Sequence, residues 1–217
     1  MLRYFNKTCG AYIETIAGQK RLAYANLDEI DFYDLIEICK KGVCPGSEIR
    51  FYDFENGNVY VPFEKKRNTI YGVPVYVGGF YYFLQGDYDK KKITLYRYLP
   101  EEEPEVVTVL SMKEVPLYNL QIIGSPVHII SEDERFTCFF PQKFSFPKKS
   151  NESGAFIADG RVYFDAWVEE DWDEERNQPG DRYKYYNMVI VRDYEGNIIS
   201  EEVGSLHQAA DGTWWIA

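Results

Sequence analysis

A tight-turn signal that recurs between short aromatic segments limits the folds open to this chain more than any other feature. In the segment from Gly154 to Ala166, two β-prone arms flank Asp159 and Gly160. An Asp-Gly pair readily adopts the positive φ angles of a primed two-residue turn, and aromatic and β-branched arms are typical of strands. This segment is therefore predicted to be a β-hairpin. Similar signals predict further hairpins with turns at Gly18, Gly57, Gly79, residues 132–134 and Gly212.

One segment, residues 27–41, is predicted to be an α-helix. Asn26 is a good N-cap with Glu29 three residues later, and Gly42 predicts a left-handed stop after two lysines. Apolar residues recur at the spacing of one helical face, which we expect to pack against a sheet. These apolar residues are Phe32, Leu35, Ile36 and Cys39.

Composition and charge narrow the class of protein. The chain has 217 residues, of which 45% are apolar and 17% aromatic, enough for one folded domain over residues 1–217. A net charge of −11 repels phosphate and anionic lipid, so we expect no nucleic-acid or membrane partner.

The N-terminus lacks the apolar core of a signal peptide, which predicts a cytoplasmic protein with reduced cysteines. No motif for a cofactor, a metal or a catalytic nucleophile is present, so none is expected.

The spacing of the turns indicates an internal duplication. Gaps of 22, 54, 27 and 52 residues separate successive turn positions, so short and long gaps alternate with a period of about 79 residues. The two predicted units are about 48–124 and 125–205. The terminal strand, residues 213–217, is predicted to pair with the N-terminal hairpin and close the sheet. The turn positions are Gly57, Gly79, Asp133, Gly160 and Gly212.

Three segments, 78–83, 92–98 and 158–164, resemble blade repeats of β-propellers of the TolB or WD40-like type. The resemblance implies a small or irregular propeller-like array of antiparallel hairpins, with a binding or scaffolding surface and no catalytic residues. A β-sandwich with one helix is the alternative fold.

The strand after Gly160 provides the candidate binding site. Alternation places Tyr163, Asp165 and Trp167 on the face opposite to the core. Together with Trp172, Tyr183 and Tyr185, they form an aromatic platform with a carboxylate, a composition suited to a sugar ring or a protein side chain. The alternative is a second buried face. The acidic segment 169–175 is predicted to be a solvated, mobile loop where a cationic partner docks.

The leading functional prediction is a non-catalytic cytoplasmic binding or scaffolding protein that contacts another protein through an acidic, aromatic-rich surface, and the negative charge favours a basic partner. The first alternative is a carbohydrate-binding protein that uses the aromatic face. The second is a carboxylate-dependent glycoside hydrolase with acids such as Asp165 and Asp173.

Overall fold

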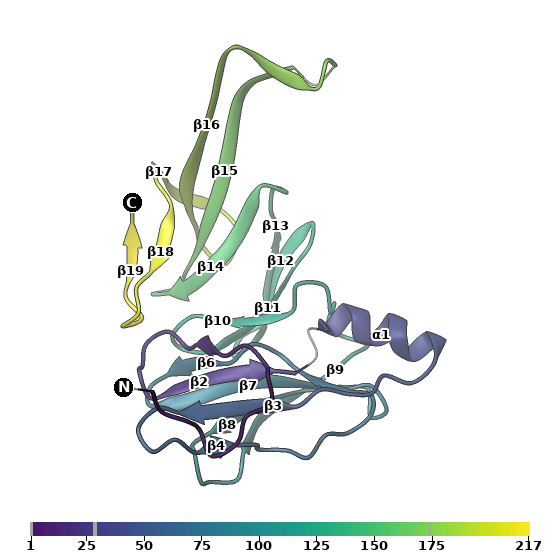
Figure 1. Ribbon diagram of the computed structural model, residues 1–217. Helices are drawn as coiled ribbons and strands as arrows, with labels where there is room; N and C mark the ends of the chain where they lie inside the picture. The colour runs from purple at the N-terminus through teal and green to yellow at the C-terminus, as the bar shows by residue number, and fades with distance from the viewer. Residues whose placement is uncertain (1, 28–29, 174) are drawn as a thin grey trace.

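The protein is an all-β molecule with antiparallel sheets and a single helix in the part of the chain that the structure describes (Figure 1). The computed structural model describes residues 2–27, 30–173 and 175–217. The predictions of antiparallel β structure and of one helix are therefore confirmed. Each sheet is built from strands that are consecutive in the sequence. Short turns or loops join most neighbouring strands, whereas residues 27–48, which include the helix, connect β2 to β3.

The first two sheets come from the N-terminal half. Sheet A contains β1 (Glu14–Thr15), β2 (Leu22–Asn26), β3 (Ile49–Asp53) and β4 (Val59–Tyr60). Sheet B contains β5 (Thr69–Tyr71), β6 (Val75–Val77), β7 (Phe80–Asp87), β8 (Lys92–Tyr98) and β9 (Glu105–Ser111).

The other three sheets follow in order. Sheet C contains β10 (Gln121–Ile123), β11 (His128–Glu132), β12 (Arg135–Phe140) and β13 (Phe144–Pro147). Sheet D contains β14 (Glu152–Ala158), β15 (Arg161–Asp173), β16 (Gln178–Arg192) and β17 (Ile198–Val203). Sheet E is the two-stranded hairpin of β18 (Leu206–Gln208) and β19 (Trp214–Ile216).

The hairpin predicted from residues 154–166 is formed by β14 and β15. Asp159 and Gly160 have φ angles of 50° and 73°, so both turn residues are left-handed, as a type I′ turn requires. The other predicted turns also join paired strands, because β1 pairs with β2, β3 with β4, β6 with β7, β11 with β12 and β18 with β19.

The helix α1 (Phe32–Lys41) is shorter than predicted. Its N-cap is Asp31, whose side chain accepts the Asp34 amide at 2.7 Å. The prediction of Asn26 as N-cap is wrong, because Asn26 ends β2 and pairs with Ile49; residues 28 and 29 lie outside the described residues. The left-handed stop is also wrong, since Gly42 has an extended φ of 172°.

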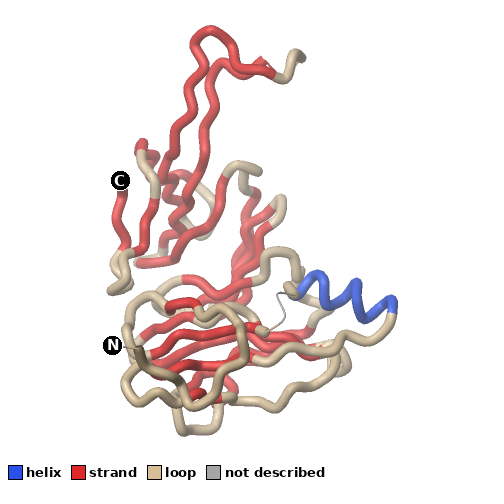
Figure 2. Tube along the Cα trace, viewed as in Figure 1, coloured by secondary structure: helices blue, strands red, loops and turns tan. Residues whose placement is uncertain are grey.

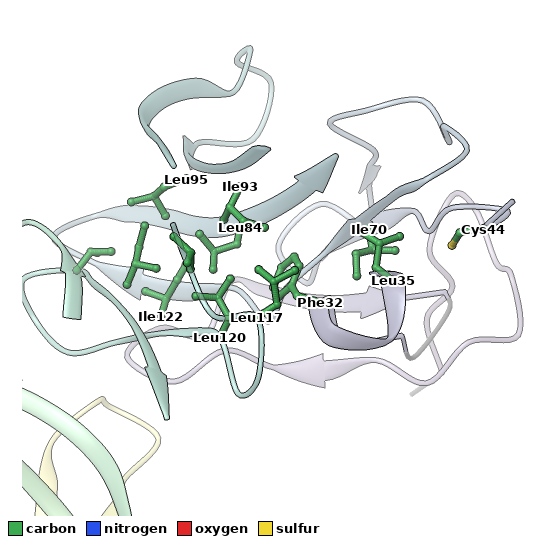
Figure 3. Close-up of a cluster of buried hydrophobic side chains, with 13 residues drawn as sticks. Phe32, Leu35, Cys44, Ile70, Leu84, Ile93, Leu95, Leu117, Leu120 and Ile122 are labelled. Atoms are coloured by element: carbon green, nitrogen blue, oxygen red, sulfur yellow. The ribbon is translucent and has the colours of Figure 1, made fainter. Parts of the chain in front are cut away.

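The apolar face of α1 packs on sheet B, as predicted (Figure 3). Phe32 and Leu35 are buried there, beside Leu84 of β7. A Cβ on Gly86 of β7 would lie only 2.9 Å from the Phe32 ring, so this glycine makes room for the helix. Sequence periodicity identified this face correctly because the helical spacing and the burial agree.

Neighbouring sheets pack face to face in chain order. Phe51 of sheet A contacts Phe83 of sheet B at 5.8 Å between ring centroids. Sheet C adds Ile122 and Ile129 to the core over sheet B, and Phe136 of sheet C meets Phe164 of sheet D at 5.3 Å. Three cores therefore connect four sheets in series.

The two ends of the chain meet through turns. The expected pairing of the terminal strand with the N-terminal hairpin is wrong, because β19 pairs with β18. Instead, the Gly18 amide in the β1–β2 turn donates to the Ala210 carbonyl in the β18–β19 turn at 3.1 Å. The borders of the predicted duplication fall inside sheets A and C, since β2 pairs with β3 and β10 with β11 across them. The duplication, the single domain and the propeller-like array stay predictions.

Helix α1 has only 10 residues, and none of the described chain forms a helix long and apolar enough to cross a membrane.

Candidate functional site

The six predicted site residues lie along β15 and β16, but the structure divides them into two environments. Val162, Phe164 and Ala166 are buried against sheet C, which confirms the predicted core face of β15. The opposite face runs from Tyr163 and Asp165, near sheet E, toward the far end of the hairpin.

Tyr163 belongs to a partly buried aromatic stack between sheets D and E. Its ring lies parallel to Phe156 at 4.2 Å between centroids, and Phe156 stacks on Trp214 of β19 at 4.8 Å. Asp165 is partly buried, and its Oδ1 atom is buried without a hydrogen-bond partner. Tyr163 therefore packs against neighbouring elements, as in the alternative of a second buried face.

The other four site residues lie where β15 and β16 extend beyond their neighbours. Pairing with β14 ends at Ala166, and pairing with β17 ends at Met188. We define residues 168–186 as the arm, a two-stranded ribbon that projects away from the sheets (Figures 1 and 2). None of its described residues is buried.

One face of the arm and its base has a row of aromatic side chains. Glu169 pairs with Tyr185, and strand alternation places Trp167, Glu169, Tyr183 and Tyr185 on the same face. Trp172 joins this row through a ring contact of 5.9 Å with Tyr183. Trp167, Trp172 and Tyr185 are 45%, 38% and 58% exposed. The structure thus brings four of the six predicted residues together on an open face, and their binding role stays a prediction.

Carboxylates hold two of the arm's three tyrosines in place. The Tyr183 hydroxyl donates to Glu169 Oε1 at 2.6 Å, and the Tyr186 hydroxyl donates to Glu170 Oε1 at 2.9 Å. These hydrogen bonds raise the pKa of both tyrosines, because an ionised phenol could not donate to a carboxylate. The arm has seven acidic and three basic residues, a net charge of −4. It is therefore an acidic surface as well as an aromatic one.

The prediction of a loop over residues 169–175 is wrong for most of the segment. β15 continues to Asp173, and Glu174 lies outside the described residues. The carboxylates take part in local structure, since Asp171 Oδ2 accepts the Arg182 amide at 2.7 Å across a bulge. Charge density alone suggested a loop, but cross-strand pairing with β16 keeps these residues extended.

Sheets C and D enclose a buried charged cluster that the sequence did not predict. Arg192 donates to Glu152 Oε1 at 2.7 Å, and the Lys148 ammonium lies 3.8 Å from Glu132 Oε2. The Gly154 amide donates to both Glu132 oxygens at 3.1 and 3.0 Å. Burial raises the pKa of Glu132, and the Gly154 amide and the Lys148 ammonium oppose this rise. The cluster lies beside a cavity of about 450 Å³. Its members come from four strands or strand ends, so no local pattern could have revealed it.

The acids proposed for glycoside hydrolysis lie too far apart. Asp165 and Asp173 are eight residues apart on β15, which corresponds to roughly 25 Å along an extended strand. Paired glycosidase carboxylates lie about 5 to 10 Å apart, so these two acids cannot act as such a pair. Among the described residues, no three His, Cys, Asp or Glu side chains gather in a way that could hold a metal ion. All four cysteines are free.

Comparisons with protein-family models, with curated proteins and with solved structures give no match to this chain.

Proposed function

We propose that this is a non-catalytic binding protein that holds a basic protein partner through the aromatic face of the arm. The observation that carries the proposal is that residues 168–186 extend beyond both neighbouring strands while presenting exposed aromatic rings and a net charge of −4.

An isolated two-stranded ribbon gains little stability from packing, because neither face is covered. Exposing the apolar rings of tryptophan and tyrosine to water is unfavourable in free energy for the free protein. The same side chains supply the anchors that dominate protein interfaces. The Trp172 and Tyr183 pair and the Tyr185 ring supply such anchors. The arm therefore has the composition of a contact surface and contributes little to the fold.

Charge supports a basic partner. The arm's net charge of −4 adds to a chain whose net charge is −11, so the whole molecule attracts cations toward this projecting element. Opposite charge accelerates encounter and favours the correct partner, while aromatic anchors slow dissociation. The arm also has two basic side chains, Arg182 and Lys184, which can form ion pairs with acidic groups of the partner.

Under this proposal, the sheets act as the scaffold that presents the arm, as a single cytoplasmic domain with a propeller-like arrangement. Support for a single domain with this arrangement comes from the sequential packing of four sheets and from the hydrogen bond between the Gly18 and Ala210 turns.

The test is partner capture by the intact protein and by an arm-less variant. Val168 and Tyr186 are directly paired, so replacing residues 169–185 by Asn-Gly joins them through a two-residue turn. Proteins retained from a cell lysate by the parent are identified, purified and titrated individually. We expect a basic protein that binds the parent and fails to bind the arm-less variant.

Matched variants separate aromatic from charge effects. Trp172→Ala should weaken binding at least about thirtyfold, the cost of a hot-spot residue. Trp215→Ala, in the β18–β19 hairpin, removes a tryptophan that is 63% exposed and should leave binding unchanged. Neutralising Glu101, Glu102 and Glu103 to Gln removes three charges from the β8–β9 connection of sheet B and should have a small effect. Equal capture by the parent and the arm-less variant would contradict the proposal.

The same face also presents exposed aromatic rings on which a sugar ring can stack, which favours the second candidate function of glycan binding. A glycan that binds the parent on an array and fails to bind the arm-less variant would assign this function instead.

A further inference from the structure

Two adjoining cavities lie between the sheets, away from the arm. One of about 800 Å³ lies between sheets A, B and C and the start of α1, and the other of about 660 Å³ has walls from all five sheets. They share Glu14, Tyr24, Val73, Gln121 and Ile122, so they meet at one place. Each has the size of a typical small-molecule pocket.

The shared wall contains a fixed carboxylate. The Tyr24 hydroxyl donates to Glu14 Oε2 at 2.9 Å, and the Tyr24 residue is only 4% exposed. Burial and the hydrogen bond to Glu14 both raise the pKa of Tyr24, so the phenol stays protonated and continues to donate at neutral pH. Glu14 itself is exposed, and it reaches the space where the two cavities meet.

The remaining lining is apolar, aromatic and acidic. Apolar walls come from Phe32, Leu84 and Ile122 in the first cavity, and Phe156 and Trp214 line the second. Asp31 lines the first cavity and Asp211 the second, while no Lys, Arg or His occurs among the described residues that line either one. An anionic ligand would therefore find no counter-charge, whereas a cation would find carboxylates and aromatic faces.

We infer that the paired cavities bind a small organic ammonium ion, with its charged nitrogen at Glu14 and its hydrocarbon body against the apolar walls. An ammonium group donates hydrogen bonds to a carboxylate with charge assistance, and an apolar body gains from leaving water. This site is separate from the arm, so the binding of the amine and the binding of a protein partner can be tested independently.

The experiment is isothermal titration calorimetry at low ionic strength with putrescine, spermidine, butylamine and 2-phenylethylamine. The neutral isostere 2-phenylethanol is the control for charge. We expect at least one of the four amines to bind with a Kd below about 1 mM. If that amine is 2-phenylethylamine, the alcohol should bind at least about tenfold more weakly.

Two variants locate the site. Glu14→Gln keeps the side-chain size, removes the charge and should weaken amine binding at least about tenfold. Val73→Trp fills the shared wall from a residue that is 61% exposed and should abolish binding, whereas Val106→Trp, on a β9 residue that is 51% exposed and lines neither cavity, should not. Circular dichroism verifies that each variant folds. The arm-less variant should bind the amine as the parent does.

Three results would overturn the inference: no amine saturates the protein below about 1 mM, Glu14→Gln binds as tightly as the parent, or Val73→Trp leaves binding intact. None of these results bears on partner capture by the arm, so the two proposals fail separately.

Discussion

Sheet B and the arm of sheet D are built from the same kind of sequence but occupy opposite environments. Phe83 of β7 is fully buried, with five other rings at 5.8 to 6.3 Å between centroids. Trp172 of the arm is 38% exposed and has one ring partner, Tyr183, at 5.9 Å. Aromatic residues and alternation therefore predict strands in both places, while burial depends on whether another sheet packs over them.

The largest effect should come from removing an aromatic side chain in each region. Phe83→Ala leaves a cavity among five rings and should lower the free energy of unfolding by about 3 to 5 kcal/mol. Trp172→Ala should change it by no more than about 0.5 kcal/mol, because the ring is exposed and no core depends on it. Urea denaturation of both variants measures the difference. Similar losses would mean that the arm is part of the core.

A second comparison uses the two faces of α1. Leu35→Ala should cost about 2 to 4 kcal/mol, because Leu35 is fully buried between the helix and sheet B. Lys41→Ala, in the exposed last turn, should stay within about 0.5 kcal/mol. An unchanged denaturation midpoint for Leu35→Ala would show that the helix does not dock on the sheet.

The C-terminal hairpin permits the same comparison within two adjacent residues. Trp214 stacks on Phe156 at 4.8 Å, whereas Trp215 is 63% exposed. We expect Trp214→Ala to cost about 2 to 3 kcal/mol and Trp215→Ala less than about 0.5 kcal/mol. Thermal unfolding of the two variants distinguishes them, and equal shifts would contradict the stacked arrangement.

A smaller, pH-dependent effect is expected at the buried charged cluster. Burial raises the pKa of Glu132 in the folded state, so the folded protein holds a proton on this residue at pH values where the unfolded chain has released it. Its contribution to stability is therefore present below the unfolded pKa and is lost as the pH rises through the raised pKa.

The measurement is the free energy of unfolding of the parent and of Glu132→Gln between about pH 4 and pH 7. Glutamine keeps an acceptor for the Gly154 amide but cannot ionise. Relative to the parent, Glu132→Gln should gain stability as the pH rises. A difference that stays constant with pH, or changes in the opposite direction, would show that Glu132 ionises normally in the fold.

Local signals predicted most of the secondary structure. The Asp159-Gly160 turn and the spacing of Phe32 and Leu35 depend on residues close in sequence, and both predictions are confirmed. The start of the helix was misplaced because Asn26 and Asp31 are comparable N-caps, and the ladder between Asn26 and Ile49 decides between them. That ladder joins residues far apart in the chain, which local reasoning does not reach.

The candidate site was predicted in composition but not in shape. Alternation assigned the faces of β15 correctly, yet it could not show that Tyr163 lies in a stack with Phe156 and Trp214 while Tyr185 stays exposed. The lengths of neighbouring strands set this difference, since β14 and β17 stop before the arm. Strand length relative to a partner is a tertiary property, so one strand's own pattern does not contain it.

The most direct test of the central claim, that the arm stands outside the cooperative core, is amide hydrogen exchange in the native protein. The backbone amides of the paired arm residues, such as Val168 and Tyr186, should exchange at least about a hundredfold faster than those of Phe83 and Gln85 in β7, because the arm opens without disturbing any core. Arm amides as strongly protected as those of β7 would contradict the account.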